Sequence, residues 1–179
     1  MKGERYKGLL IFTDASYSTQ TKVAGFGFVI VSGDYEYRAG NFALNCSDNN
    51  VAEIGAIASA LKYCETLGLF RKSSDKTLTI ITDSRTAEGR INRHEQGKHE
   101  AEQGWLKFIE RSIQRSGHKA RVLQVKGHSK DDSKFSQYNE IADWIADDYR
   151  YLGEIEKKNQ QYKSKRIISV YDNGRKGGR

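Results

Sequence analysis

Residues 8–14 of the chain read Gly-Leu-Leu-Ile-Phe-Thr-Asp, a short apolar run that ends in a carboxylate. A run of this length, bounded by glycine, predicts a buried strand over residues 8–13. Asp14 follows it directly. Ligand sites in α/β proteins lie beyond the carboxyl ends of the strands. We therefore expect a functional site at the end of this first strand.

The sequence around this strand predicts further strands and helices. Residues 25–31 and 35–42 have the pattern of two more strands, and the three together are expected to form an antiparallel meander. The other predicted elements are helices over residues 52–63, 84–91, 100–115 and 139–152 and strands over residues 76–82 and 120–126. Strands separated by helices pair in parallel through right-handed crossovers. The predicted fold class is α/β, with a mixed five-stranded sheet (three antiparallel, then two parallel strands) and helices on both faces.

The positive charge of the chain is concentrated at its C-terminal end. The net charge is +7, and residues 154–179 carry +5 of it, from eight Lys or Arg and three Asp or Glu. We expect one folded domain over residues 1–153 and a mobile basic extension over residues 154–179.

Composition also limits where the protein works. The 179 residues suit one domain, and no apolar run is long enough for a transmembrane helix. The two cysteines, Cys46 and Cys64, cannot form a disulfide framework. The expectation is a cytoplasmic monomer without a membrane partner.

Four carboxylates stand at the ends or on the faces of predicted elements. Asp14 and Asp83 follow strands, Glu53 opens a helix, and Asp143 lies in the last helix. Gathered carboxylates repel one another unless they share protons or bind cations, and their oxygens suit Mg²⁺. Simpler interpretations exist for each: turn residues after strands, a capping box of Glu53 with Asn50, and a solvated helix face for Asp143.

Two other patterns carry no function. Residues 25–28, Gly-Phe-Gly-Phe, lack the third glycine and the following helix of a dinucleotide-binding fingerprint. His94, His99 and Glu100 resemble a metal-binding cluster, but they lie in a predicted polar loop.

Five short segments of the chain resemble the type 1 ribonuclease H family. They are Ile11-Phe12-Thr13-Asp14-Ala15-Ser16, Asn49-Asn50-Val51-Ala52-Glu53, Ile80-Ile81-Thr82-Asp83-Ser84, Val125-Lys126-Gly127-His128 and Asn139-Glu140-Ile141-Ala142-Asp143. All five occur in the family's order and span most of the chain. The resemblance implies the ribonuclease H-like fold, in agreement with the sheet predicted above.

The resemblance also implies an activity and the residues that carry it. It implies an endoribonuclease that hydrolyses the RNA strand of RNA–DNA hybrids by two-metal-ion catalysis, largely independently of sequence, leaving 5′-phosphate and 3′-hydroxyl ends. The implied ligands of two Mg²⁺ ions, for which Mn²⁺ could substitute, are Asp14, Glu53, Asp83 and Asp143. His128 would assist proton transfer or product release. The implied substrate contacts are Ala15, Ser16, Asn49, Asn50, Ser84 and Arg85.

Some features depart from the family pattern. Ala15 stands in place of the usual glycine, Arg85 stands where many members have glutamine, and the loop of residues 129–138 is longer than in compact bacterial members. The basic helical protrusion of some members is expected to be absent or vestigial, because the segment of residues 85–100 is short and nearly neutral. We expect the basic C-terminal extension to replace it as a nonspecific phosphate anchor, with a merely solubilising tail as the alternative.

Two other functions stay open at this point. The same fold hosts DNA exonucleases and junction resolvases. A catalytically inactive hybrid-binding module would keep the fold without the chemistry, although the presence of all four carboxylates argues against it.

Overall fold

The structure of the protein is a computed structural model, which describes residues 8–125 and 134–174, with side chains as far as residue 162 in the last helix. The strands are β1 (Leu9–Tyr17), β2 (Ala24–Ser32), β3 (Tyr35–Ala43), β4 (Thr77–Thr82) and β5 (Lys119–Gln124). They form a five-stranded sheet in the order β3-β2-β1-β4-β5. The pairs among β1, β2 and β3 are antiparallel, and β4 pairs in parallel with both β1 and β5. The predicted fold class and mixed sheet are confirmed.

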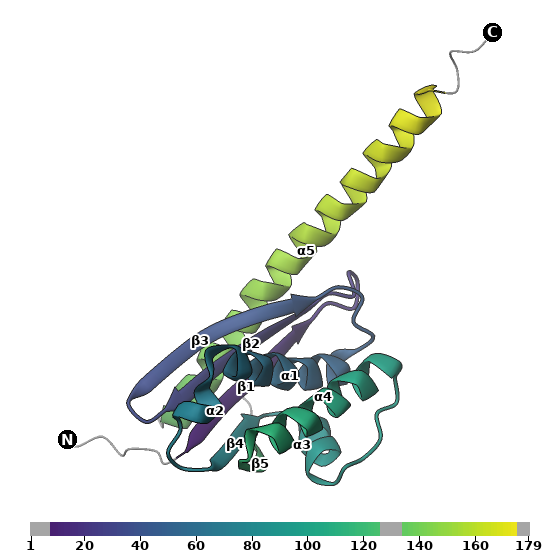
Figure 1. Ribbon diagram of the computed structural model, residues 1–179. Coiled ribbons are helices and arrows are strands. Elements are labelled where there is room, and N and C mark those ends of the chain that lie inside the picture. Colours follow the sequence, from purple (N-terminus) through teal and green to yellow (C-terminus); the bar gives the residue numbers. More distant parts are fainter. Residues whose placement is uncertain (1–7, 126–133, 175–179) are drawn as a thin grey trace.

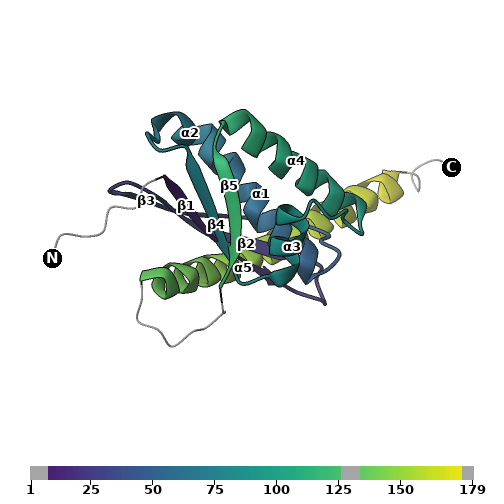
Figure 2. The ribbon, with the colours of Figure 1, turned by 90° about the horizontal axis from the view of Figure 1, so that it is seen from below.

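Helices cover both faces of this sheet (Figure 1). They are α1 (Asn49–Leu67), α2 (Leu69–Lys72), α3 (Arg85–Asn92), α4 (Glu100–Ser116) and α5 (Lys134–Gly174). Figure 2 shows α5 on one side of the sheet and α1 and α4 on the other. Among the described residues, no helix combines the length and the apolar character needed to cross a bilayer.

The two faces of β1 contribute to two separate parts of the core. Ile11 packs with Ile54 of α1 in the larger apolar cluster. Phe12 points to the other face, where its ring centroid lies 5.0 Å from that of Tyr138 on α5. Successive side chains of a strand point to opposite faces. Burial on both faces therefore explains why β1 is continuously apolar from Leu9 to Phe12.

Two glycines allow α5 to lie directly on β2. A Cβ atom at Gly25 would collide with the backbone of Ala146 and Arg150, and one at Gly27 would collide with the backbone of Ala142 and Ala146. The side chain of any other residue would therefore force the helix away from the strand. The Gly-Phe-Gly-Phe pattern thus has a packing role.

Several element boundaries differ from the sequence-based expectation. β1 continues beyond residue 13 to Tyr17, because it pairs with β2 along its whole length. α1 begins at Asn49, since the Asp48 side chain accepts a hydrogen bond from the backbone N–H of Val51 and caps the helix. The last helix was expected to end at residue 152, which is wrong: α5 runs to Gly174. The short helix α2 has no counterpart among the predicted elements.

Contacts beyond residue 153 still hold α5 to the body of the molecule. The Thr21 hydroxyl donates to Glu154 Oε1 over 2.9 Å. The Lys157 ammonium donates to the Thr21 carbonyl at 2.7 Å and to Asn45 Oδ1 at 2.8 Å. The expected boundary between residues 153 and 154 therefore falls inside one helix. The division into a domain and a mobile extension stays a prediction.

Candidate active site

Strand register brings Asp14 and Asp83 to the same level of the sheet. β1 and β4 pair in parallel from Leu9 with Leu78 to Phe12 with Ile81, where the ladder ends. An aspartate stands two residues beyond each member of this last pair, Asp14 in β1 and Asp83 directly after the end of β4. Asp14 does not follow β1, as the sequence suggested, but lies within it, opposite Gly27 of β2. The two carboxylates therefore occupy the place where pairing between β1 and β4 stops.

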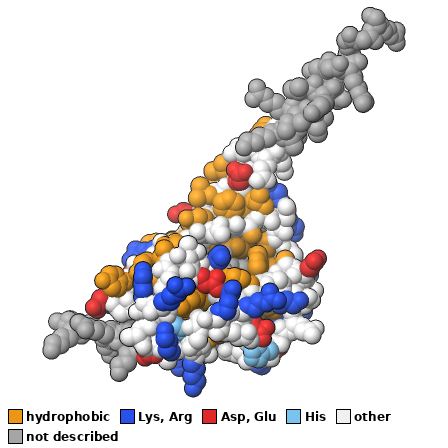
Figure 3. Space-filling model, in the orientation of Figure 1, with side chains coloured by type: hydrophobic (Ala, Val, Ile, Leu, Met, Phe, Trp, Pro, Cys, Tyr) orange, Lys and Arg blue, Asp and Glu red, His pale blue; other side chains and the backbone are white. Residues whose placement is uncertain are grey.

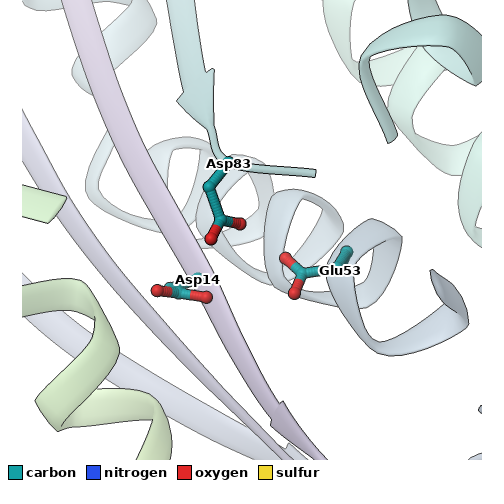
Figure 4. Close-up of side chains that lie close together, drawn as sticks. All are labelled: Asp14, Glu53 and Asp83. Carbon is teal, nitrogen blue, oxygen red and sulfur yellow. The ribbon is translucent and has the colours of Figure 1, made fainter. Parts of the chain in front are cut away.

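Glu53 approaches this place from α1. It is only 5% exposed, on a helix whose neighbouring residues are buried and apolar. The interpretation of Glu53 as a capping-box partner of Asn50 is wrong, because the cap of α1 is Asp48. Figure 4 shows the Glu53 carboxylate turned toward Asp14 and Asp83.

The three carboxylates are close enough to share a cation. One carboxylate oxygen from each of Asp14, Glu53 and Asp83 lies within 4.8 Å of the other two. Asp14 Oδ1 accepts a hydrogen bond from the Ala15 backbone N–H over 2.8 Å. Glu53 Oε2 is buried and has no hydrogen-bond partner, which is costly for a polar atom. The cluster therefore contains acceptor capacity that the chain itself does not satisfy.

Burial and mutual repulsion raise the pKa values of two of these carboxyl groups. The pKa of Asp14 is raised from its ordinary 3.8 to about 7, first by burial and then by the charge of Asp83, while the Ala15 N–H lowers it. The pKa of Glu53 lies well above its ordinary 4.5, through burial first and then the charge of Asp14. Both causes penalise the ionised carboxylates, and a cation between them would compensate that penalty.

Asp143, the fourth predicted carboxylate, lies beside this group. It is partly buried on α5, and its negative charge contributes to the raised pKa of both Asp14 and Glu53. It does not join the three that lie mutually within 4.8 Å among the described residues. Asp147, one turn later, accepts a hydrogen bond from the Ser16 hydroxyl, so Asp143 and Asp147 differ in their surroundings.

The donor set suits a hard divalent cation. Mg²⁺ prefers carboxylate and water oxygens and is often held by one or two carboxylates plus substrate phosphate. Asp14, Glu53 and Asp83 supply three carboxylates, and Glu53 Oε2 is a buried oxygen without a donor. These three residues could therefore hold a metal ion, with Asp143 next to them.

Some of the residues predicted to contact substrate already form hydrogen bonds within the protein, and others are exposed. The Ser84 hydroxyl accepts a hydrogen bond from the Ala87 backbone N–H over 3.2 Å and caps α3. The Ser16 hydroxyl, besides donating to Asp147, accepts from Arg150 Nε over 2.9 Å. The side chains of Asn49 and Asn50, by contrast, are exposed in the first turn of α1.

Asn50 and Arg85 line one groove of about 410 Å³. Its wall also includes Arg93 and Lys98, both exposed. The sequence did not indicate these cations as a group, because three glutamates nearly balance the four Lys or Arg of residues 85–100. Figure 3 shows Lys and Arg side chains spread over the face that carries α1, α3 and α4. The groove thus presents the Asn50 amide and four cations, of which Arg90 and Arg93 form ion pairs with Glu95 or Glu102 of the same groove.

Two further predictions concern the loops. His128 lies outside the described residues, so its predicted role is not tested. Residues 93–99 link α3 directly to α4, and no helical protrusion stands between them, as predicted. His99 does not belong to a histidine cluster: its Nε2 lies 3.1 Å from Asp48 Oδ2.

Comparison with known proteins identifies the family. The RNase H family model matches residues 6–150, and no curated protein matches the sequence. RNase H1 from the halophilic archaeon Halobacterium salinarum NRC-1 has a similar structure, with a TM-score of 0.59 at 18% identity over 79% of this chain and 96% of that chain. LC11-RNase H1, isolated from compost, was solved in complex with an RNA/DNA hybrid and matches with a TM-score of 0.58 at 19% identity over 79% of this chain and 98% of that one. The N-terminal RNase H domain of a Mycobacterium tuberculosis protein matches with a TM-score of 0.56 at 14% identity over 81% of this chain and 97% of that one.

The structural matches share the fold of this chain, and the family match covers all four carboxylates, from Asp14 to Asp143. The acidic cluster lies where the two parallel-paired strands of that fold separate. The chain belongs to the RNase H family and is a ribonuclease H enzyme.

Proposed function

We propose that the protein hydrolyses the RNA strand of RNA–DNA hybrids as an endoribonuclease, using two divalent ions and leaving 5′-phosphate and 3′-hydroxyl ends. The observation that carries the proposal is the convergence of Asp14, Glu53 and Asp83 within 4.8 Å in a chain of the RNase H family. The hybrid bound to the similarly folded LC11-RNase H1 supports the choice of substrate.

In this proposal Asp14, Glu53, Asp83 and Asp143 hold Mg²⁺, for which Mn²⁺ could substitute. Bound divalent ions supply an activated water and stabilise the leaving oxygen in phosphodiester hydrolysis. The chain contributes rigid placement: Glu53 is buried on α1, and Asp14 lies within β1, where it pairs with Gly27 of β2. Little side-chain order must therefore be gained when the metal and the substrate bind.

Substrate recognition is proposed to be independent of base sequence. Asn49 and Asn50 are exposed at the start of α1, four and three residues before Glu53, where their amides can contact 2′-hydroxyl groups of the RNA strand. Arg85 and the groove cations suit phosphate groups. Ala15, Ser16 and Ser84 are proposed to contact substrate beside the carboxylates. His128 is proposed to assist proton transfer or product release.

Cleavage of a labelled RNA–DNA hybrid tests this function. We expect turnover with Mg²⁺ and none after addition of EDTA. Asp83→Asn should lower turnover at least about 100-fold while hybrid binding changes little, because the carboxylate acts on the metal and not on the duplex. Asp34→Asn, an exposed carboxylate in the β2–β3 turn, is the matched control and should cleave at the wild-type rate.

A substrate panel separates this proposal from other nuclease activities of the fold. The hybrid should be cleaved, and duplex DNA, single-stranded RNA and a four-way DNA junction should not. Cleavage of the junction or the DNA duplex in preference to the hybrid would overturn the proposed substrate. Hybrid binding without cleavage under Mg²⁺ and Mn²⁺ would identify an inactive binding module. A cytoplasmic location is part of the same proposal and fits the two free, buried cysteines.

A further inference from the structure

The outward face of α5 carries a row of exposed apolar side chains. Seven large apolar side chains are exposed within the described part of the chain, and five of them lie on this one helix. They are Trp144 (68% exposed), Tyr151 (65%), Leu152 (51%), Ile155 (51%) and Tyr162 (72%). Single exposed apolar residues are common, whereas a contiguous set marks an interaction surface. Figure 3 shows hydrophobic side chains along the part of α5 that leaves the body.

Four of these residues, Trp144, Tyr151, Ile155 and Tyr162, form a straight line and are called the α5 stripe. Their spacings of seven, four and seven residues place them within about 20° of one direction on a helix that turns about 100° per residue. Ala142, Ala146 and Gly153, which are buried against the sheet, lie on the opposite side of the same helix. The α5 stripe therefore points directly away from the sheet and is not covered by the described part of the chain.

The α5 stripe is symmetric about its own midpoint. Trp144 and Tyr162 are equally distant from residue 153, and so are Tyr151 and Ile155. Two such helices packed antiparallel around a two-fold axis at this level would therefore place every stripe residue of one opposite a stripe residue of the other. Isologous contacts of this kind are the usual basis of homodimers.

The charges beside the α5 stripe share this midpoint. Asp148 and Lys158 are both exposed and lie next to the stripe, five residues on either side of residue 153. Within one chain they are ten residues apart, about 15 Å along the helix, too far for an ion pair. In the antiparallel arrangement, Asp148 of each copy lies opposite Lys158 of the other. The charge pattern is therefore complementary to itself in this direction and not in the parallel one.

We propose that the α5 stripe is a homodimer interface in which two copies of α5 pack antiparallel about an axis level with Gly153. This inference goes beyond the proposed function and does not depend on it. It replaces the expectation of a monomer, which the comparisons leave untested. Lys157 and Glu154 support the arrangement, because their contacts with Thr21 and Asn45 keep the central part of the stripe on a helix fixed to the body.

The available apolar area is sufficient for a small specific dimer. A fully enclosed aromatic side chain buries roughly 150–250 Å². The aromatic residues of two stripes, each about two-thirds exposed, thus offer on the order of 600–1,000 Å² before Ile155 and Leu152 are added. Together these values approach the roughly 1,200 Å² at the lower end of specific interfaces. We expect a dimer of moderate affinity.

Sedimentation equilibrium of the full chain tests the interface. The wild type should show a concentration-dependent dimer. Ile155→Glu should shift the equilibrium to monomer, because the two-fold axis brings the new carboxylates of both copies into the centre of the interface. Tyr35→Glu, at an equally exposed aromatic on β3, should leave the dimer intact. Circular dichroism confirms that Ile155→Glu remains folded. A wild type that is monomeric at the highest concentration at which it stays soluble overturns the proposal.

Charge exchange tests the antiparallel direction. Asp148→Lys alone and Lys158→Asp alone should each weaken the dimer roughly tenfold or more, because like charges then face each other twice. Mixing the two single variants should restore dimerisation as a heterodimer, since every facing pair becomes opposite in sign. The double variant Asp148→Lys with Lys158→Asp should also recover the wild-type affinity. Failure of both the mixture and the double variant to recover overturns the antiparallel interface.

Discussion

The buried carboxyl group of Glu53 destabilises the fold, although it is the group proposed to bind metal. A carboxyl group on the buried face of α1 destabilises the apolar core, and neighbouring negative charges add to this effect. The free energy of folding therefore depends on what neutralises Glu53, either a proton or a cation. The stability of this ribonuclease H should respond to pH and to divalent ions through the same few side chains.

The pH response can be predicted from Asp14. Its pKa is about 7 in the folded protein and 3.8 ordinarily, so the folded state binds a proton that the unfolded state releases between these values. The destabilisation is therefore greatest above about pH 7, decreases as the pH falls through the folded pKa, and is lost below the unfolded pKa. In EDTA, ionisation of Asp14 should make the free energy of unfolding of the wild type about 1 kcal/mol lower at pH 8 than at pH 6.

Asp14→Asn should remove this part of the pH dependence and stabilise the metal-free protein at pH 8 by on the order of 1–3 kcal/mol. The amide oxygen can still accept the hydrogen bond from Ala15. Thermal unfolding in EDTA at both pH values measures the effect. An unchanged pH dependence in the variant would show that Asp14 is ionised normally.

The response to metal can be predicted from Glu53. Mg²⁺ should raise the unfolding temperature of the wild type, by the equivalent of about 2.7 kcal/mol at a concentration 100 times the dissociation constant. Glu53→Gln should raise the stability of the metal-free protein and lose most of the Mg²⁺ response. Calorimetric titration with Mg²⁺ checks the loss of binding independently of activity. An equal Mg²⁺ response in both proteins would contradict the assignment of Glu53 as a ligand.

At the scale of elements, α5 contacts β2 backbone against backbone at Gly25 and Gly27. Gly27→Ala would place a methyl group against the backbone of Ala142 and Ala146, which cannot move without displacing the helix. We expect a loss of about 1–3 kcal/mol or more and a lower activity, because Asp143 lies on the displaced helix. Urea unfolding and the hybrid assay measure the two effects.

Gly104→Ala is the matched control for this substitution. Gly104 is exposed on α4, and a Cβ atom there meets nothing within 4 Å. Alanine stabilises a helix interior relative to glycine by roughly 0.5–1 kcal/mol. The two glycine substitutions should therefore shift stability in opposite directions. Equal effects would indicate that α5 does not rest on Gly27.

The sequence predicted the elements better than their ends. Apolar periodicity and β-branched runs located every strand and the four longer helices, because these patterns follow from burial. Ends are determined by single contacts that periodicity does not contain. Asp48 could be recognised as the cap of α1 only once its side chain was seen to accept from Val51. The length of α5 escaped prediction because the basic composition of residues 154–179 indicated a solvated extension and not a helix.

The site was predicted to a similar extent. The local segments and their order pointed to Asp14, Glu53 and Asp83, and the structure brings these three together. The groove at Asn50 could not be predicted, because Arg93 and Lys98 face it only through the folding of the α3–α4 connection. His128 lies outside the described residues and stays a prediction.

At the scale of the whole molecule, the basic C-terminal segment can be separated from the contacts that hold α5. Residues 163–179 contain six Lys or Arg and one Asp. A chain that ends at Tyr162 keeps Glu154, Lys157 and the α5 stripe. We expect it to retain wild-type stability and to bind hybrid with a higher KM. The logarithm of the hybrid-binding constant falls with the logarithm of the salt concentration, and this slope should become less steep by as much as about 5.

A chain that ends at Gly153 is the contrasting variant. It loses the hydrogen bonds of Glu154 and Lys157 to Thr21 and Asn45 and should therefore unfold a few degrees lower. Salt-dependent hybrid binding and thermal unfolding distinguish the two truncations. An unchanged salt slope in the chain ending at Tyr162 would rule out a phosphate anchor and leave a solubilising tail.

The glycines of β2 have one more consequence, which concerns how the sequence can change over evolutionary time. Because α5 rests on the sheet through main-chain atoms at β2 and through side chains of its inner face, the position of Asp143 depends little on the side chains of the opposite, solvent-facing side of that helix. Substitutions can therefore accumulate on its solvent side without disturbing the carboxylates. Homologues could gain, lose or exchange oligomeric partners at this surface while the cleavage chemistry stays constant.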